Sequence, residues 1–190
     1  KFCYGLTTVA GIAQGLFVLY KNPRSRVNVT WALFSFSVAV WAAGTAWYFF
    51  ASRDDMALLI GRISLYAAVW IPVLYCHFCL ALLNKRLRQR PLVITGYVFA
   101  IVMAGFSLSP WFIQSVPPKL IFRHYAAPGP LCVAFTVQFF ILAFYAHWLL
   151  FRSLRYELPE RKNQIRYVAI GTLIAYACGS TNFLLLYDIP

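Results

Sequence analysis

The chain alternates between long apolar segments and short polar connections. Six segments are apolar over roughly the 20 residues that a helix needs to cross the hydrocarbon core of a bilayer: 2–20, 29–51, 57–83, 91–113, 131–151 and 167–187. The pattern therefore predicts an all-α integral membrane protein. We expect an up-and-down bundle of six transmembrane helices that forms a single domain over residues 1–190. The proline-rich connection before the fifth segment predicts an irregular, strand-free loop.

The connections on the two sides of this bundle differ in charge. Those after the first, third and fifth segments, KNPRSR, NKRLRQR and RSLRYELPERKNQIR, hold twelve of the seventeen basic residues. The other five, including Lys1 and Arg62, belong to the opposite side. By the positive-inside rule the basic connections are cytoplasmic, so the N-terminus is outside. We expect anionic lipid headgroups as their partners and no nucleic acid.

Composition excludes a soluble domain. Hydrophobic residues make up 62% of the chain and charged residues 12%, and the mean hydropathy is +0.68. A soluble fold of this composition would expose large apolar patches and aggregate. The chain opens with Lys1 rather than Met, so we expect a piece of a longer protein.

The acidic residues all lie in connections or at helix ends, at Asp54, Asp55, Glu157, Glu160 and Asp188. Proton pumps, ion-coupled transporters and retinal proteins generally need a carboxylate at membrane depth. The pattern argues against these classes. A small-solute transporter or channel stays open as the alternative, although the chain also lacks mirrored broken helices.

Two patterns could carry redox or metal chemistry. Cys76 and Cys79 share one helix face, but no second Cys or His pair follows at ligand spacing. His77 and His147 lie at similar predicted depth and could bind a haem axially, which leaves a membrane redox enzyme as a third possibility. Packing is the simpler interpretation of both patterns, so we expect neither a cofactor nor a metal.

Small residues at helical spacing predict close helix contacts. Gly171, Ala175 and Gly179 form such a stripe in the sixth segment, and Gly11 and Gly15 form a shorter one in the first. The second segment has a similar stripe at Ser35, Ala39 and Ala43.

Candidate ligand-binding residues lie in the outer half of the bundle. Asn182 cannot satisfy its amide within its own helix, so it should bond another helix or a ligand. Arg62 could reach the headgroups or contact a ligand at an outward pocket, near a kink at Pro72. The full candidate set is Arg62, Tyr66, Trp70, Trp111 and Asn182, and no residue is predicted to be catalytic.

The end of the chain carries the most specific motifs. The entry N-Q-I-R-Y at 163–167 is followed by G-T-L-I at 171–174, Gly179-Ser180, Thr181-Asn182 and Ile189-Pro190. With these motifs the chain resembles the N-terminal seven-helix sensor region of bacterial membrane histidine kinases and related diguanylate cyclases. Supporting matches are the stretch 41–44, Ile71-Pro72 with His77-Phe78, and Pro128-Gly129-Pro130. Departures are Ser180, where a second Gly is common, and Leu184-Leu185, where Pro-Leu is common.

The resemblance implies a sensory input module in the bacterial cytoplasmic membrane. It would couple an extracytoplasmic or membrane stimulus to a cytoplasmic kinase or cyclase, in a homodimer formed through downstream domains. A seventh helix beyond residue 190 is also implied. The sequence contains no phosphoacceptor, nucleotide-binding or cyclase motif, so we expect catalysis outside it.

Overall fold

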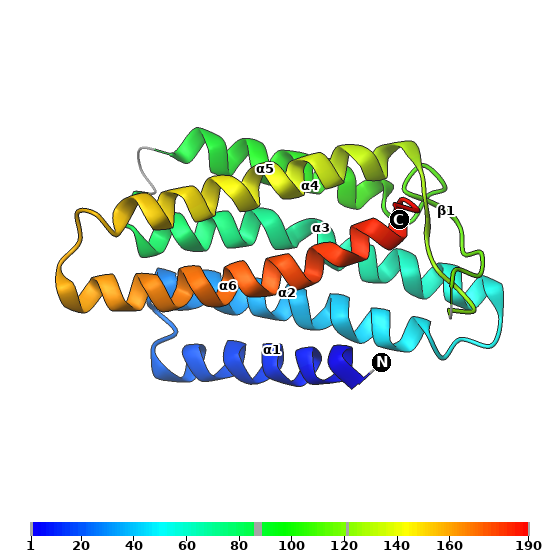
Figure 1. Cartoon of the computed structure of the whole chain (residues 1–190), viewed down its shortest axis with the longest axis horizontal. Coiled ribbons are helices and arrows are strands. Elements are labelled where there is room, and N and C mark those ends of the chain that lie inside the picture. Colours follow the sequence, from blue (N-terminus) through cyan, green and yellow to red (C-terminus); the bar gives the residue numbers. More distant parts are fainter. Residues whose placement is uncertain (1, 86–88, 121, 190) are drawn as a thin grey trace.

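The computed structural model describes residues 2–85, 89–120 and 122–189. Each of the six apolar segments forms a helix, and successive helices run in opposite directions along a common axis (Figure 1). The helices are α1 Phe2–Lys21, α2 Arg26–Tyr48, α3 Asp54–Leu82, α4 Arg90–Phe106, α5 Pro130–Ser153 and α6 Pro159–Leu186. The predicted all-α class is therefore confirmed.

Five of these helices are long and apolar enough to cross a membrane, and α4 is shorter, at 17 residues. The predicted end of the fourth segment at 113 is wrong, because α4 ends at Phe106. Ser107 Oγ donates to the Ala104 carbonyl at 2.8 Å, and Ser109 Oγ donates to the Phe106 carbonyl at 2.7 Å. Pro110 follows and has no N–H with which to continue the helix.

The connection between α4 and α5 contains a small sheet, so the expectation of a strand-free loop is wrong. Strand β1, Ile113–Ser115, pairs antiparallel with β2, Ala127–Pro128. Gly129 follows β2 where the chain passes very close to Trp111. A Cβ on Gly129 would lie 2.2 Å from the Trp111 carbonyl oxygen, so the loop can close only around a glycine.

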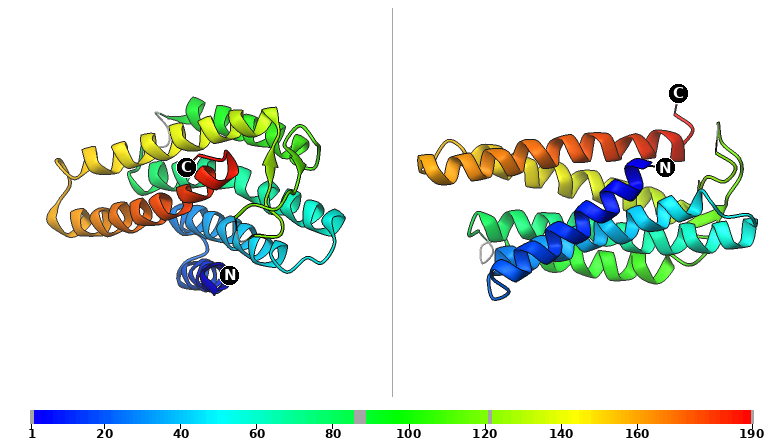
Figure 2. Two further views of the ribbon diagram at one scale, coloured as in Figure 1. Left: turned by 45° about the vertical axis from the view of Figure 1, so that its right-hand side comes forward. Right: turned by 90° about the horizontal axis from the view of Figure 1, so that it is seen from below.

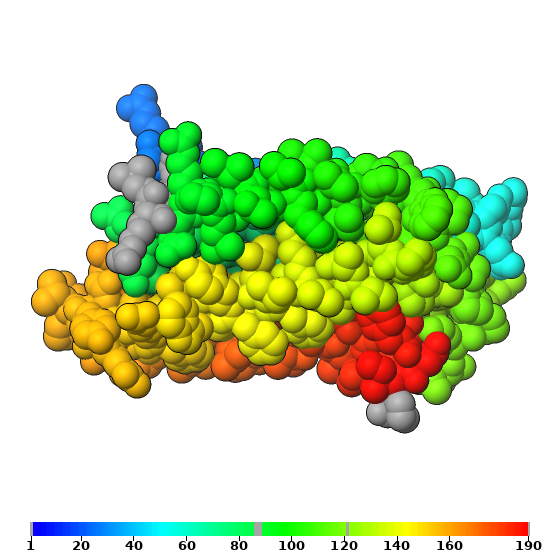
Figure 3. Space-filling view, turned by 90° about the horizontal axis from the view of Figure 1, so that it is seen from above, coloured from blue at the N-terminus to red at the C-terminus, as the bar shows by residue number. Residues whose placement is uncertain are grey.

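Helix α3 forms the centre of the bundle and contacts α2, α4 and α5. Its side chains are buried over most of its length, and the helix continues through Pro72. Helices α4 and α5 run side by side along one face (Figure 3). In contrast, α1 packs against α2 and α6 packs mainly against α5. The first and last helices are therefore the least enclosed.

The two ends of the bundle differ in character. The connections after α1, α3 and α5 lie at one end, which we call the basic end; the sheet and both termini lie at the other, the sheet end (Figures 1 and 2). The basic end therefore holds the three basic connections. Arg86 and Arg88 of the second connection lie outside the described residues, and so do Lys1 and Pro190 at the chain ends. At the basic end, Arg161 Nη2 donates to the Leu82 carbonyl at 2.6 Å and caps the end of α3.

Helices α1 and α2 approach closely through small residues, as predicted. A Cβ on Gly11 would lie 2.9 Å from the Ser35 carbonyl oxygen and 3.1 Å from the Ala39 Cβ. A Cβ on Gly15 would lie 2.5 Å from the Phe36 ring. Larger residues at Gly11 and Gly15 would push the two helices apart.

Candidate functional site

A cleft of about 800 Å³ is lined by α6 on one side and by α1, α2 and α3 on the other. Small-molecule pockets in proteins have volumes of about 300–1,000 Å³, so the cleft is large enough for a small organic molecule. Its lining is mostly aliphatic and aromatic, and among the described residues none of the lining side chains is charged. Aromatic side chains from several helices face it, including Trp41, Phe49, Phe139 and Phe183.

The small-residue stripe of α6 lines this cleft. Gly171, Ala175 and Gly179 all border it, and a Cβ on either glycine would meet no atom within 4 Å. Among the described residues no helix packs against the two glycines, so the predicted helix contact along this stripe stays a prediction. Within the described residues, Gly171 and Gly179 leave space beside α6.

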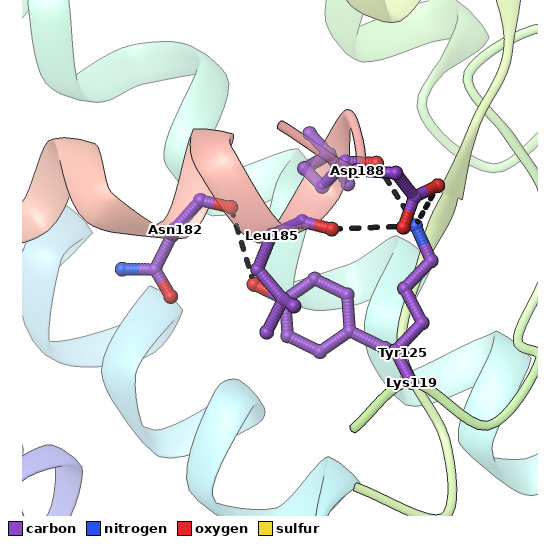
Figure 4. Close-up of polar contacts among 6 residues, drawn as sticks. Lys119, Tyr125, Asn182, Leu185 and Asp188 are labelled. Carbon is purple, nitrogen blue, oxygen red and sulfur yellow. Dashed lines mark hydrogen bonds and ion pairs between the residues drawn. The ribbon is translucent and has the colours of Figure 1, made fainter. Parts of the chain in front are cut away.

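Asn182 joins three parts of the molecule at the sheet end of the cleft. Tyr4 of α1 donates from its hydroxyl to Asn182 Oδ1 at 2.6 Å, so Asn182 does bond another helix. Asn182 Nδ2 donates to the Gly179 carbonyl at 2.9 Å, and Tyr125 donates to the Asn182 carbonyl at 3.2 Å (Figure 4). Burial raises the pKa of the Tyr125 hydroxyl well above its ordinary value, which keeps it a protonated donor.

Lys119 holds the end of α6 from the same loop. Its ammonium group donates to the carbonyls of Leu185 at 3.3 Å and Leu186 at 3.1 Å, and it pairs with the Asp188 carboxylate at 2.9 Å (Figure 4). A cation at a helix C-terminus is favourable because the last carbonyls carry partial negative charge. We call Lys119, Tyr125, Asn182 and Asp188 the α6 anchor.

Further toward the basic end, a buried polar cluster connects α3, α5 and α6. The Tyr75 hydroxyl lies 2.7 Å from Thr172 Oγ1 and 3.1 Å from His147 Nε2. His147 Nδ1 lies 2.8 Å from the Ala143 carbonyl, which can only accept, so Nδ1 carries the proton and Nε2 is the acceptor. His77 instead contacts the Tyr97 hydroxyl of α4 at 3.0 Å through its Nδ1.

These contacts bear on the haem and metal possibilities. His77 and His147 bond different residues in different helix interfaces, the arrangement of packing histidines rather than of two ligands that face one porphyrin. Cys76 and Cys79 are both buried within α3. Over 2–85, 89–120 and 122–189, no three His, Cys, Asp or Glu side chains gather as a metal site would require.

Two tyrosines whose side chains border the cleft have buried hydroxyls without a hydrogen-bond partner among the described residues. They belong to Tyr48 at the end of α2 and Tyr176 in the middle of α6. An unsatisfied buried hydroxyl costs about 1–3 kcal/mol. Both hydroxyl oxygens are enclosed by the surrounding residues, so neither faces the open space of the cleft.

The structure does not bring the five predicted ligand residues together. Asn182 lines the cleft, whereas Arg62, Tyr66 and Trp70 lie on another face of α3. Arg62 Nη2 donates to the Ile113 carbonyl at 2.9 Å and positions β1. The Tyr66 and Trp70 rings contact each other, with centroids 6.5 Å apart, and Trp111 is 61% exposed beside the sheet.

The sequence analysis missed Tyr48 and Tyr176. A signal for Tyr176 was present, because the positions that face the cleft from α6 recur at the helical spacing of three to four residues. These positions are 168, 172, 175, 176, 179, 182, 183 and 186. Counting back from Asn182 at that spacing would have placed Tyr176 on the same face. Tyr48 gives no comparable signal.

The fold and the cleft define a multi-pass helical membrane protein. The family model described as the N-terminal 7TM region of histidine kinase matches residues 3–189, and the chain belongs to this family. It is thus a membrane sensory input module, and the resemblance noted in the sequence is confirmed. Neither a curated protein nor a solved structure gives a significant match.

Proposed function

We propose that this module senses a stimulus through the cleft and transmits it by moving α6 relative to α1, α2 and α3. The output in the complete receptor would be a cytoplasmic histidine kinase. The observation that carries the proposal is the cleft itself, since α6 packs mainly against α5, contacts α3 at Tyr75, and borders open space toward α1 and α2. A helix held in this way is less enclosed than α3 and has room to shift relative to α1 and α2.

Among the residues that the structure describes, the polar contacts across the cleft are few enough for a stimulus to change them. At the sheet end the link from α1 to α6 is the hydrogen bond from Tyr4 to Asn182 (2.6 Å). A hydrogen bond contributes about 0.5–1.5 kcal/mol net, and useful coupling between sites needs about 1–3 kcal/mol. A ligand or a change in the membrane can supply a difference of that size.

The proposed setting is the bacterial cytoplasmic membrane, with the basic end in the cytoplasm and the N-terminus outside. The concentration of basic residues at one end supports this orientation, and it places those residues beside anionic headgroups. The sheet and the α6 anchor then face the extracytoplasmic side. A homodimer formed through downstream kinase domains completes the proposed receptor.

The test uses the full-length receptor in proteoliposomes and measures autophosphorylation. Asn182→Leu removes the side-chain link from α6 to α1, and we expect basal autophosphorylation to change about fivefold, the effect of about 1 kcal/mol. Thr181→Val is the matched control, because among the described residues the Thr181 hydroxyl bonds the Cys178 carbonyl of its own helix, at 2.7 Å, and no other helix. Equal, wild-type output from both folded variants would contradict the proposal.

A further inference from the structure

We propose that the cleft holds the seventh helix of the 7TM region, which would follow residue 190 in the full-length receptor. This inference rests on the proposed function, because it names the element that would carry a movement of α6 to the cytoplasmic kinase. The family is described by seven transmembrane helices, whereas residues 2–85, 89–120 and 122–189 form six. The length of the cleft, the surface of α6 and the course of the chain after α6 support the same occupant.

The cleft is about as long as a helix that crosses a membrane. Its lining extends from Tyr167 to Leu186 on α6 and from Trp31 to Tyr48 on α2. At 1.5 Å per residue these stretches are about 29 Å and about 26 Å long, close to the thickness of about 30 Å of the hydrocarbon core. None of the side chains in the described lining is charged, which suits the apolar side chains of a membrane-spanning helix.

The face of α6 that borders the cleft is suited to contact with a helix. Gly171, Ala175 and Gly179 lie one turn apart on it, and a Cβ on either glycine would meet no atom within 4 Å. Glycine within a helix is unfavourable relative to alanine, but small residues let a second helix approach closely in a membrane. The stripe on α1 has such a neighbour, since a Cβ on Gly11 would lie 2.9 Å from the Ser35 carbonyl oxygen. The stripe on α6 has none among the described residues.

Helices α1 and α6 both border the cleft and are the least enclosed of the long helices. Within the apolar stretch of each helix, 11% of the α1 residues and 17% of the α6 residues are buried, against 56% of the α3 residues. One additional helix in the cleft would cover both at once. A movement of α6 relative to α1 and α2 would then reach that helix directly.

The course of the chain favours the helix after α6 as the occupant. In the proposed orientation α6 ends outside, so the chain must cross the membrane once more to reach a cytoplasmic kinase. Asp188 has a φ of 54°, and the Ile189 N–H donates to the Leu184 carbonyl at 2.9 Å. This arrangement ends a helix in a sharp turn. The turn lies next to the sheet end of the cleft, which Asn182 and Leu186 line.

Cysteine cross-linking in the full-length receptor tests the proposal. With the exposed Cys3 and Cys178 replaced by Ser, Gly179→Cys would be combined with single cysteines at successive positions of the first apolar span after residue 190. Oxidation in native membranes joins two cysteines whose Cα atoms lie within about 7 Å. We expect disulfides at every third or fourth position of that span, the spacing of one helix face. Gly105→Cys is the matched control and should form none, because Gly105 does not border the cleft.

A larger side chain in the stripe provides a second measurement. Leucine at Gly171 would begin in open space within the described residues, but it would overlap a helix that occupies the cleft. In Gly171→Leu we therefore expect cross-linking between residue 179 and the span to fall about fivefold or more. Gly105→Leu should leave this cross-linking unchanged, although its Cβ also meets no atom within 4 Å.

The proposal would be overturned if Gly179→Cys formed no disulfide with the span, or formed disulfides without helical spacing. Disulfides formed instead with a second copy of the receptor, or with a span that precedes residue 1, would overturn it as well. The same holds if Gly171→Leu leaves the cross-linking intact.

Cross-linking is measured without reference to kinase activity, so the two proposals can fail separately. Cross-linking at helical spacing, together with unchanged autophosphorylation in Asn182→Leu, would support the position of the seventh helix and contradict the coupling. An output that responds to Asn182→Leu in a receptor without these cross-links would do the reverse.

Discussion

Single polar side chains determine how the end of α6 is held. Lys119 illustrates this most clearly, because its side chain is only 11% exposed and contacts two carbonyls and a carboxylate of the α6 end. Tyr125 and Asn182 add contacts from the loop and from α6 itself. Together these groups satisfy backbone carbonyls that have no partner within the helix.

Removing the Lys119 ammonium should therefore loosen the last turn of α6. In Lys119→Met we expect the amides of Tyr187 and Ile189 to exchange hydrogen about 5- to 30-fold faster, the effect of about 1–2 kcal/mol. Hydrogen exchange read by mass spectrometry measures this directly. Arg123→Met in the same loop is the control, since Arg123 is exposed. Equal exchange in the two variants would show that the anchor contributes nothing.

At the scale of elements, specific hydrogen bonds and close packing hold the loop between α4 and α5 in place. Ser107 and Ser109 end α4, Arg62 bonds the main chain of β1, and Gly129 allows β2 to pass against Trp111. The Phe112 and Ile113 side chains that follow Pro110 are fully buried. The loop thereby closes the sheet end of the core around α3.

Gly129→Ala should destabilise this element. The new Cβ would lie 2.2 Å from the Trp111 carbonyl oxygen, so the backbone must shift, and we expect a loss of about 1–3 kcal/mol. Gly105→Ala is the matched control and should be neutral or slightly stabilising, because Ala is the better helix former and the added methyl group meets open space. Thermal unfolding in detergent would compare the two. A Gly129→Ala midpoint equal to that of Gly105→Ala would contradict this account.

The lengths of the apolar segments predicted the six helices, because a helix that crosses the bilayer needs a run of about 20 apolar residues and such runs are visible in the sequence. The end of α4 could not be found in this way, since residues 108 and 111–113 are apolar although they lie in turns and in β1. The cleft was also beyond prediction. Arg62, Tyr66 and Trp70 share a helix face, but only the packing of α2 and α4–α6 around α3 decides which face of α3 borders open space.

At the scale of the whole molecule, the six helices separate two chemically different ends. The basic end holds three basic connections, and the sheet end holds the folded loop and both termini. Each end offers an exposed side chain as a marker: Tyr156 is 80% exposed at the basic end and Leu120 is 87% exposed at the sheet end.

These markers allow a test of orientation. With the exposed Cys3 and Cys178 replaced by Ser, we expect a membrane-impermeant maleimide to label Leu120→Cys in intact cells, because the sheet end faces outside. Tyr156→Cys should react only after the membrane is permeabilised. The reverse pattern, or equal labelling of both variants in intact cells, would contradict the orientation drawn from the positive-inside rule.

The separation of charge between the two ends has a further effect in an energised membrane. In the proposed orientation, most of the net charge of +12 resides on the electrically negative side. Carrying one elementary charge across a potential of 100 mV requires about 2.3 kcal/mol. The membrane potential therefore acts on the inserted bundle as a constant electrical force that opposes inversion.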